Sequence, residues 1–314
     1  MQFAMSFKII GVLLILFSTA MLPSLFLSLT AKDGIESAFA TGLATTLFAG
    51  VMLWLPTRHL SRDLNIRDGF LVTALFWVVL GLFGAIPLWL SPGLDLSPVA
   101  AIFESISGLT TTGATVITGL DTLPQSILLY RQLLQWLGGI GIIVLAVAIL
   151  PMLGIGGMQL YRAESAGPSK DRKLTPRITS TAKALFGIYL LLTIACTVSY
   201  FAAGMSAFDA ICHAFSTVAI GGFSTHDASL GYYEQNRVLL VSSVFMLLSA
   251  LNFGLHFIAL QRRNVRVYAR DSETAFFITV IALATVVVCC LLLTTETLDF
   301  EDSIIHGLFQ TISI

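Results

Sequence analysis

The chain has 314 residues, of which 56% are hydrophobic and only 11% are charged, and its mean hydropathy is +0.88. A soluble domain carries roughly 25% charged residues, so this composition excludes an ordinary soluble domain and indicates an integral membrane protein. The formal net charge of -1 argues against a nucleic-acid-binding surface.

Long apolar segments follow one another along the chain, each near the roughly 20 residues that a helix needs to cross a bilayer. Seven spans are predicted, at residues 9–30, 37–56, 69–90, 128–153, 184–204, 237–260 and 275–295. The first span also resembles a signal peptide, because Lys8 precedes it. Its apolar run continues to Leu29, however, well beyond the roughly 7–15 residues of a signal core. We therefore interpret it as a spanning helix.

Basic residues gather in alternate loops. Most of the 17 lysines and arginines lie in the N-terminal segment and in loops 57–68, 157–183 and 261–274. By the positive-inside rule, these loops and the N-terminus are predicted to be cytoplasmic. The loops near 96–125 and 205–235 then lie outside and bring acidic residues to an outer mouth, where they would attract cations. These acids are Asp95, Glu104, Asp121, Asp209, Asp227 and Glu234. Each alone is also compatible with an ordinary solvated loop.

Two shorter segments repeat one pattern: Phe103-Glu-Ser-Ile-Ser-Gly-Leu-Thr-Thr-Thr-Gly113-Ala-Thr and Cys212-His-Ala-Phe-Ser-Thr-Val-Ala-Ile-Gly-Gly222-Phe-Ser. Each lies between long apolar spans and is too short and polar to cross a bilayer. Ser97-Pro98 is a good helix start, and a helix from there to about Leu109 would cross roughly half of the hydrocarbon. Ser206 begins the second half-helix in the same way.

The segments after the two half-helices are the candidate ion site. Both half-helices enter from outside, so their partly negative C-terminal ends favour a cation near the membrane centre. Glycine then lets the chain return outward in a tight strand, whose carbonyl oxygens would replace the hydration shell of the ion. The predicted filter strands are Thr111, Thr112 and Gly113, and Ile220, Gly221 and Gly222. Hydroxyls predicted to hold these strands from behind are Thr110, Thr115, Ser224 and Thr225. The alternative for either loop alone is an ordinary Gly/Thr-rich turn.

The unit of span, half-helix and span recurs along the chain. We divide it into two extra N-terminal helices (1–68), a first unit with its cytoplasmic loop (69–183), a second unit with its loop (184–274) and the start of a third (275–314). The third half-helix is expected near Asp302, where Phe309-Gln-Thr-Ile-Ser313 repeats Phe103-Glu-Ser-Ile-Ser107. Two complete units and the start of a third cannot close the wall of a pore. We therefore expect this sequence to be the N-terminal part of a longer chain.

An enzyme is not predicted. An intramembrane protease needs a catalytic pair at membrane depth, whereas the spans hold few ionisable residues and no Gly-x-Ser-x-Gly motif. No phosphate loop or organic cofactor is indicated. The glycines at 138, 139 and 141 are interpreted as close helix packing. His256 and Asn252 either line an inner cavity or bond across helices, and the sequence leaves both interpretations open.

Three motifs together closely resemble the Trk/Ktr/HKT potassium transporter superfamily, and among its members the TrkH-type translocation subunits. They are Thr110-Thr-Thr-Gly113-Ala-Thr115, Gln135-Trp-Leu-Gly-Gly-Ile-Gly141 and Ser216-Thr-Val-Ala-Ile-Gly-Gly222-Phe-Ser-Thr-His-Asp227. The resemblance covers about residues 1–314. It implies an all-α polytopic membrane protein whose helix–pore-loop–helix units surround a pseudo-fourfold pore, truncated here in the third unit.

The resemblance also implies the ion and the partners. Carbonyls of the six filter residues would bind K+, and Gly113 implies potassium because family members with serine at that glycine tend toward sodium. It further implies a homodimer in the bacterial inner membrane and a cytosolic TrkA-type nucleotide-binding ring that gates the pore. We thus predict potassium uptake. A Na+-permeable or Na+-coupled transporter and a non-conducting fragment are the open alternatives.

Overall fold

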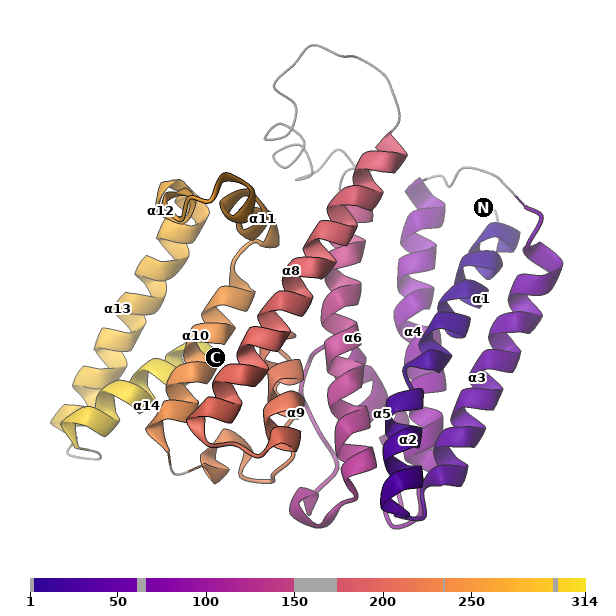
Figure 1. Cartoon of the computed structure of the whole chain (residues 1–314), viewed down its shortest axis with the longest axis horizontal. Coiled ribbons are helices and arrows are strands. Elements are labelled where there is room, and N and C mark those ends of the chain that lie inside the picture. The colour runs from indigo at the N-terminus through magenta and orange to yellow at the C-terminus, as the bar shows by residue number, and fades with distance from the viewer. Residues whose placement is uncertain (1–2, 61–65, 150–173, 234, 296–298) are drawn as a thin grey trace. The chain divides into compact units, whose positions relative to one another are not determined.

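The computed structural model describes residues 3–60, 66–149, 174–233, 235–295 and 299–314 (Figure 1). Every regular element among these residues is a helix, so the described chain is all-α, as the sequence predicts. The chain forms two compact units. From here on, the first and second unit mean these two compact parts and not the repeats of the sequence pattern. The first contains residues 1–166 and 221–227, and the second contains residues 167–220 and 228–314.

The first unit is a group of helices around one half-helix. Its elements are α1 (Phe3–Thr19), α2 (Leu22–Ala31), α3 (Glu36–Thr57), α4 (Ile66–Leu90), α5 (Pro98–Leu109), the short 3-10 helix η1 (Leu120–Thr122) and α6 (Gln125–Ile149). Helix α1 packs along α3, where glycines let the two backbones approach. A Cβ on Gly11 would lie 2.8 Å from the carbonyl oxygen of Gly50. The half-helix α5 packs against α4 and α6.

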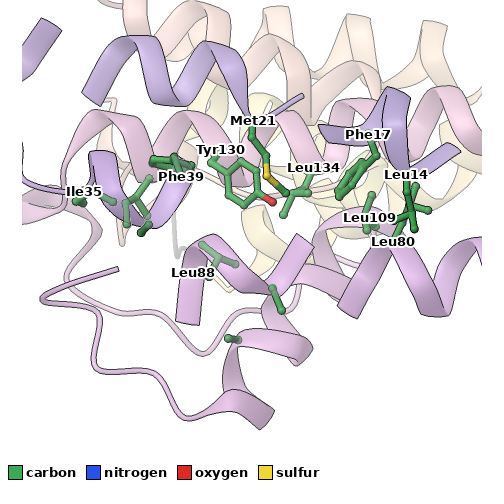
Figure 2. Close-up of a cluster of buried hydrophobic side chains, with 14 of the residues drawn as sticks. Leu14, Phe17, Met21, Ile35, Phe39, Leu80, Leu88, Leu109, Tyr130 and Leu134 are labelled. Carbon is green, nitrogen blue, oxygen red and sulfur yellow. The ribbon is translucent and has the colours of Figure 1, made fainter. Parts of the chain in front are cut away.

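A buried apolar cluster joins these helices and fixes the end of α5. Figure 2 labels Leu14, Phe17, Met21, Ile35, Phe39, Leu80, Leu88, Leu109, Tyr130 and Leu134 from this cluster. The rings of Phe39 and Tyr130 meet edge to face with centroids 5.3 Å apart, and the Tyr130 hydroxyl donates to the carbonyl of Gly84 at 2.9 Å. Because Leu109 is the last residue of α5 and is 1% exposed, the core sets the position from which the following strand starts.

The second unit repeats the span–half-helix–span order. Its elements are α8 (Leu174–Ala203), α9 (Ala207–Val218), the 3-10 helix η2 (Ser229–Tyr232), α10 (Asn236–Ala250), α11 (Phe253–Arg262), α12 (Arg266–Arg270), α13 (Ser272–Thr294) and α14 (Phe300–Ser313). Helix α9 packs on α8 and α10, and α14 packs on α10 and α13. The α13–α14 pair lies where the sequence predicts the start of a third repeat, and α14 begins at Phe300, close to the predicted Asp302.

Five described helical segments are long and apolar enough to cross a membrane: Ala4–Ala31, Glu36–Thr57, Phe70–Leu90, Ala182–Ala203 and Ser272–Thr294. They match five of the seven predicted spans. The span predicted at 128–153 corresponds to α6 as far as residue 149, and its remainder lies outside the described residues, as do Glu234 and much of the loop at 157–183.

The span predicted at 237–260 corresponds to two helices that are together long and apolar enough for a membrane but are sharply bent at a break. Helix α10 ends at Ala250, α11 begins at Phe253, and the two axes differ by 93°. The apolar pattern continues across the break, but the Asn252 side chain accepts the N–H of Gly254 at 2.9 Å and so starts a new helix.

The hydrogen bonds of His256 decide between its two interpretations, an inner cavity or a bond across helices. Its Nε2 lies 2.8 Å from the Leu248 carbonyl oxygen, and its Nδ1 lies 2.7 Å from the hydroxyl of Tyr268. Because a carbonyl only accepts, Nε2 donates and Nδ1 accepts from the tyrosine. Since Leu248, His256 and Tyr268 belong to α10, α11 and α12, this side chain bonds across helices.

Candidate cation filter

Both half-helices begin at a serine that caps their first turn. The Ser97 hydroxyl accepts the N–H of Ala100 at 3.2 Å, and Pro98 occupies the first helical position. The Ser206 hydroxyl accepts the N–H of Asp209 at 3.0 Å and donates to the Asp209 carboxylate at 2.7 Å. An acid in the first turn is favourable because it faces the positive end of the helix dipole. The predicted starts of both half-helices are therefore confirmed.

Helix α5 ends in a tight backbone turn that redirects the chain. The N–H of Thr111 donates to the carbonyl of Gly108 at 3.0 Å, and the N–H of Thr112 donates to that of Ser107 at 2.9 Å. These two bonds form a Schellman motif, which requires a left-handed residue just after the helix. Thr111 occupies this place with φ of 56°.

Helix α9 ends in the same way, one repeat later. The N–H of Ile220 donates to the carbonyl of Thr217 at 3.1 Å, and Ile220 has φ of 53°. A β-branched residue in the left-handed region is a genuine outlier, which costs about 1–3 kcal/mol. Thr111 and Ile220 thus stand at equivalent positions of the two loops and carry the same backbone strain.

Two residues beyond each strained residue stands a left-handed glycine. Gly113 has φ of 76° and Gly222 has φ of 85°, a conformation that glycine adopts without strain. The two strands meet at these positions: a Cβ on Gly113 would overlap the carbonyl oxygen of Gly221. The strands thus approach backbone to backbone, with no room for a side chain at Gly113.

The structure brings some of the predicted filter residues together. Gly113, Gly221 and Gly222 adjoin one another in the first unit. Thr111 and Thr112 lead into Gly113, with Thr112 exposed and Thr111 half-buried. Ile220 belongs to the second unit, where it follows α9, and its side chain is 50% exposed.

Gln135 supports the second strand. Its Oε1 accepts the N–H of Phe223 at 3.0 Å, and its side chain fills the place where a Cβ of Gly221 would lie. Gln135 is fully buried on α6. It lies in the second of the three sequence motifs, so one side chain links that motif to the third.

An ion pair lies behind both strands. Arg131 of α6 and Glu104 of α5 are 1% and 0% exposed, and their closest N–O distance is 2.8 Å. The Arg131 Nε also donates to Glu104 at 2.9 Å. Just past the first strand, the Thr115 hydroxyl donates to the carboxylate at 2.9 and 3.0 Å, and the Val116 N–H donates to it at 3.0 Å. Each partner of the pair is therefore satisfied.

Arg131 extends the same network to the second strand. Its guanidinium donates to the Thr115 hydroxyl at 3.0 Å and to the Ser224 carbonyl at 3.2 Å. It also stacks over the Phe223 ring, 4.4 Å from its centroid. A single side chain thus contacts the segments that follow both strands.

One sequence-based expectation changes here, and two others find their contacts. Glu104 was predicted at the solvated outer mouth, and this is wrong: it is buried because α5 carries it below the surface. Of the hydroxyls expected to hold the strands, Thr115 bonds to Glu104. The Thr110 hydroxyl donates to the Ile106 carbonyl of its own helix at 2.8 Å and lies 2.7 Å from the Thr112 hydroxyl of the first strand.

The segments that follow the two strands are joined by hydrogen bonds to two acidic side chains. The Asp227 carboxylate accepts the N–H groups of Gly119 and Leu120, each at 3.0 Å. Asp121 contacts the ring of His226 at 2.5 Å and accepts the Asp227 N–H at 3.3 Å. The hydrogen bond from His226 lowers the pKa of Asp121 below its ordinary value. Asp121 and Asp227 are exposed, as predicted for a mouth.

Gly138 explains how α6 comes close enough to support both strands. A Cβ there would overlap the carbonyl oxygen of Leu109, the last residue of α5. A Cβ on Gly141 would lie 3.3 Å from the ring of Phe76 on α4. The prediction that these glycines serve close packing is confirmed at both positions.

Comparison with known proteins places these features in one family. The TrkH family profile, described as cation transport protein, matches residues 35–313. The Halomonas elongata Trk system potassium uptake protein TrkH is 52% identical over 314 residues, which cover 100% of this chain and 65% of the relative. The Escherichia coli K12 protein TrkG is 44% identical over 307 residues, 97% of this chain and 63% of the relative.

A solved structure agrees. The crystal structure of the potassium transporter TrkH from Vibrio parahaemolyticus matches with a TM-score of 0.91 and 49% identity. The match covers 100% of this chain and 64% of that one. The chain therefore spans a little under two thirds of the length of the relatives that it matches.

Proposed function

Because the chain belongs to the TrkH family of cation transport proteins, we propose that it forms part of a pore for potassium uptake. The observation that carries this proposal is the close approach of the two strands, in which the Gly221 carbonyl oxygen occupies the place of a Gly113 side chain. Backbone at this depth in a membrane is tolerated where it lines a pore, and carbonyl oxygens are the usual ligands of K+ there.

In this proposal the ion is bound by the carbonyls of Thr111, Thr112, Gly113, Ile220, Gly221 and Gly222. The strained turns at Thr111 and Ile220 support it, because they place both strands at the same point after their half-helices. The carboxyl-terminal dipoles of α5 and α9 add a partly negative field toward the ion. K+ is the cargo, and no organic cofactor is required.

The orientation and partners are part of the same proposal. The basic loops support an N-terminus in the cytoplasm of a bacterial cell, with the acidic residues Asp121 and Asp227 at the outer mouth. Relatives are named as members of Trk systems, which supports assembly with further subunits. We include a homodimer and a TrkA-type nucleotide-binding ring among these partners.

The test measures the uptake of Rb+ relative to Na+ into liposomes that contain the full-length natural protein. Selective Rb+ uptake is expected. Gly113→Ser is expected to weaken it or shift it toward Na+, because the serine Cβ displaces the Gly221 carbonyl. Equal uptake of both ions would favour the Na+-permeable alternative. Flux that ignores Gly113 would refute the filter assignment.

A further inference from the structure

We propose that the buried Arg131–Glu104 pair is the positioning element that fixes the two filter strands relative to each other. The part of this inference that concerns ion selection rests on the proposed function. The part that concerns the strands rests on the structure alone. Neither residue is offered as an ion ligand: each acts through the backbone that it holds.

The network joins four segments of the first unit at one point. Glu104 belongs to α5 and Arg131 to α6, and they are 27 residues apart in the chain. Val116 lies just past the first strand and bonds to the glutamate, while Ser224 lies just past the second and bonds to the arginine. The separation of the strands is thus set by two side chains whose own geometry is fixed by their ion pair.

Arginine suits this task better than lysine. Its planar fork offers donors in several fixed directions, so it bonds to Glu104, Thr115 and Ser224 at once. Its flat face also stacks on Phe223. A lysine would keep the charge and pair with the carboxylate, but a point charge with a single ammonium would lose the stacking and the contact with the second strand.

The pair acts by position rather than by charge. Its two members lie in contact, so their fields largely cancel at a distance and add little net potential to the filter. Removing one member leaves a buried unpaired charge, which is strongly destabilising, whereas replacing both with neutral residues of similar volume is often tolerated. This difference provides a way to separate a loss of folding from a loss of positioning.

The test measures hydrogen–deuterium exchange in peptides that cover residues 111–118 and 221–227, on the purified protein. In Arg131→Lys, exchange at 221–227 is expected to rise about tenfold, as the loss of a charge-assisted hydrogen bond predicts. Exchange at 111–118, which Glu104 still holds, is expected to change little. The double variant Glu104→Gln/Arg131→Met is expected to fold and to exchange faster in both segments.

Tyr130→Phe is the matched control. Tyr130 is the neighbour of Arg131 on α6, is fully buried, and bonds to the Gly84 carbonyl of α4 instead of a filter strand. Its loss is expected to leave exchange in both segments unchanged. Unchanged exchange at 221–227 in Arg131→Lys and in the double variant would overturn the inference, as would an equal rise in Tyr130→Phe.

Ion uptake by the same variants separates this inference from the proposed function. If the parent protein selects Rb+ over Na+, Arg131→Lys is expected to lower that ratio at an unchanged protein level. A ratio that stays at the parent value while exchange rises would overturn the link to selectivity. If the parent shows no selective uptake, the proposed function fails, while the exchange result still decides whether the pair positions the strands.

Discussion

The two filter loops share a backbone but not a support. Both have a serine-capped half-helix, a strained β-branched residue and a left-handed glycine, and the second loop follows the first at the same spacing. In that alignment His213 of α9 stands where α5 has Glu104. His213 is 2% exposed, bonds to the Asp209 carbonyl through Nδ1 at 2.9 Å, and meets the rings of Tyr200 and Tyr233.

The second strand therefore takes its support from the first repeat. Residues 221–227 pack as part of the first unit, where Gln135 and Arg131 of α6 bind Phe223 and Ser224. The backbone geometry after the two half-helices is thus the same, whereas the side chains that hold the two strands differ. One helix, α6, holds both strands.

The largest expected effect contrasts the two glycines. Gly113→Ala is expected to reduce Rb+ uptake by at least tenfold, because the new Cβ overlaps the Gly221 carbonyl oxygen. Gly222→Ala carries only the left-handed backbone cost of about 1–2 kcal/mol, because no atom lies within 4 Å of its Cβ position. Liposome uptake measures both, and an equal loss would show that the two strands are not supported differently.

A second contrast concerns helix packing. Gly138→Ala is expected to lower the free energy of unfolding by about 2 kcal/mol, because α6 must shift away from the Leu109 carbonyl to make room for the new Cβ. Gly187→Ala in α8 is the control, because its Cβ meets open space and alanine favours a helix by about 1 kcal/mol. Thermal unfolding in detergent gives both values. A harmless Gly138→Ala would contradict the close approach of α6.

A third variant tests the support that α6 gives to the second strand. Gln135→Leu removes the acceptor of the buried Phe223 N–H, and an unsatisfied buried donor costs about 1–3 kcal/mol. We expect a lower melting temperature and faster amide exchange at 221–227, with 111–118 nearly unchanged. The reverse pattern of exchange would mean that Gln135 supports the first strand instead.

The smallest effect is expected at Asp121, in the hydrogen bonds that join the segments after the two strands. The hydrogen bond from His226 lowers the pKa of the Asp121 carboxyl below its ordinary value. A carboxyl with a lowered folded pKa stabilises the protein above its unfolded pKa and loses that contribution as pH falls through the folded value. Asp121→Asn should therefore have a lower melting temperature than the parent at neutral pH. The difference between the two melting temperatures should disappear below about pH 4. A difference in melting temperature that does not depend on pH would contradict a stabilising role for the ionised Asp121 carboxylate.

Local signals made the half-helices predictable. Ser97-Pro98 and Ser206 with Asp209 carry the chemistry of their helix starts within a few residues, so the pattern alone places both starts. The α10–α11 break was missed because a single Asn252 outweighs an apolar pattern that continues past it.

The ion pair was not predicted because its partners meet only through tertiary packing. Glu104 was assigned from its loop, although α5 carries it to a depth at which a carboxylate needs a partner. One signal was present in the sequence: Arg131 is the single basic residue between Arg67 and Arg162. Gln135 gave no comparable signal, because a glutamine in an apolar helix does not show what it bonds to.

The dependence of the second strand on α6 also sets an order of events during synthesis. Ser224 is made 93 residues after Arg131, which at 5–20 residues per second is a delay of about 5–20 s. Glu104 precedes Arg131, so the arginine finds its counter-ion as soon as α5 and α6 are both made. The buried ion pair is thus complete before Ser224 is made, and the hydrogen bonds from residues 221–227 to α6 and to residues 119–121 form only after the ribosome has completed the second half-helix.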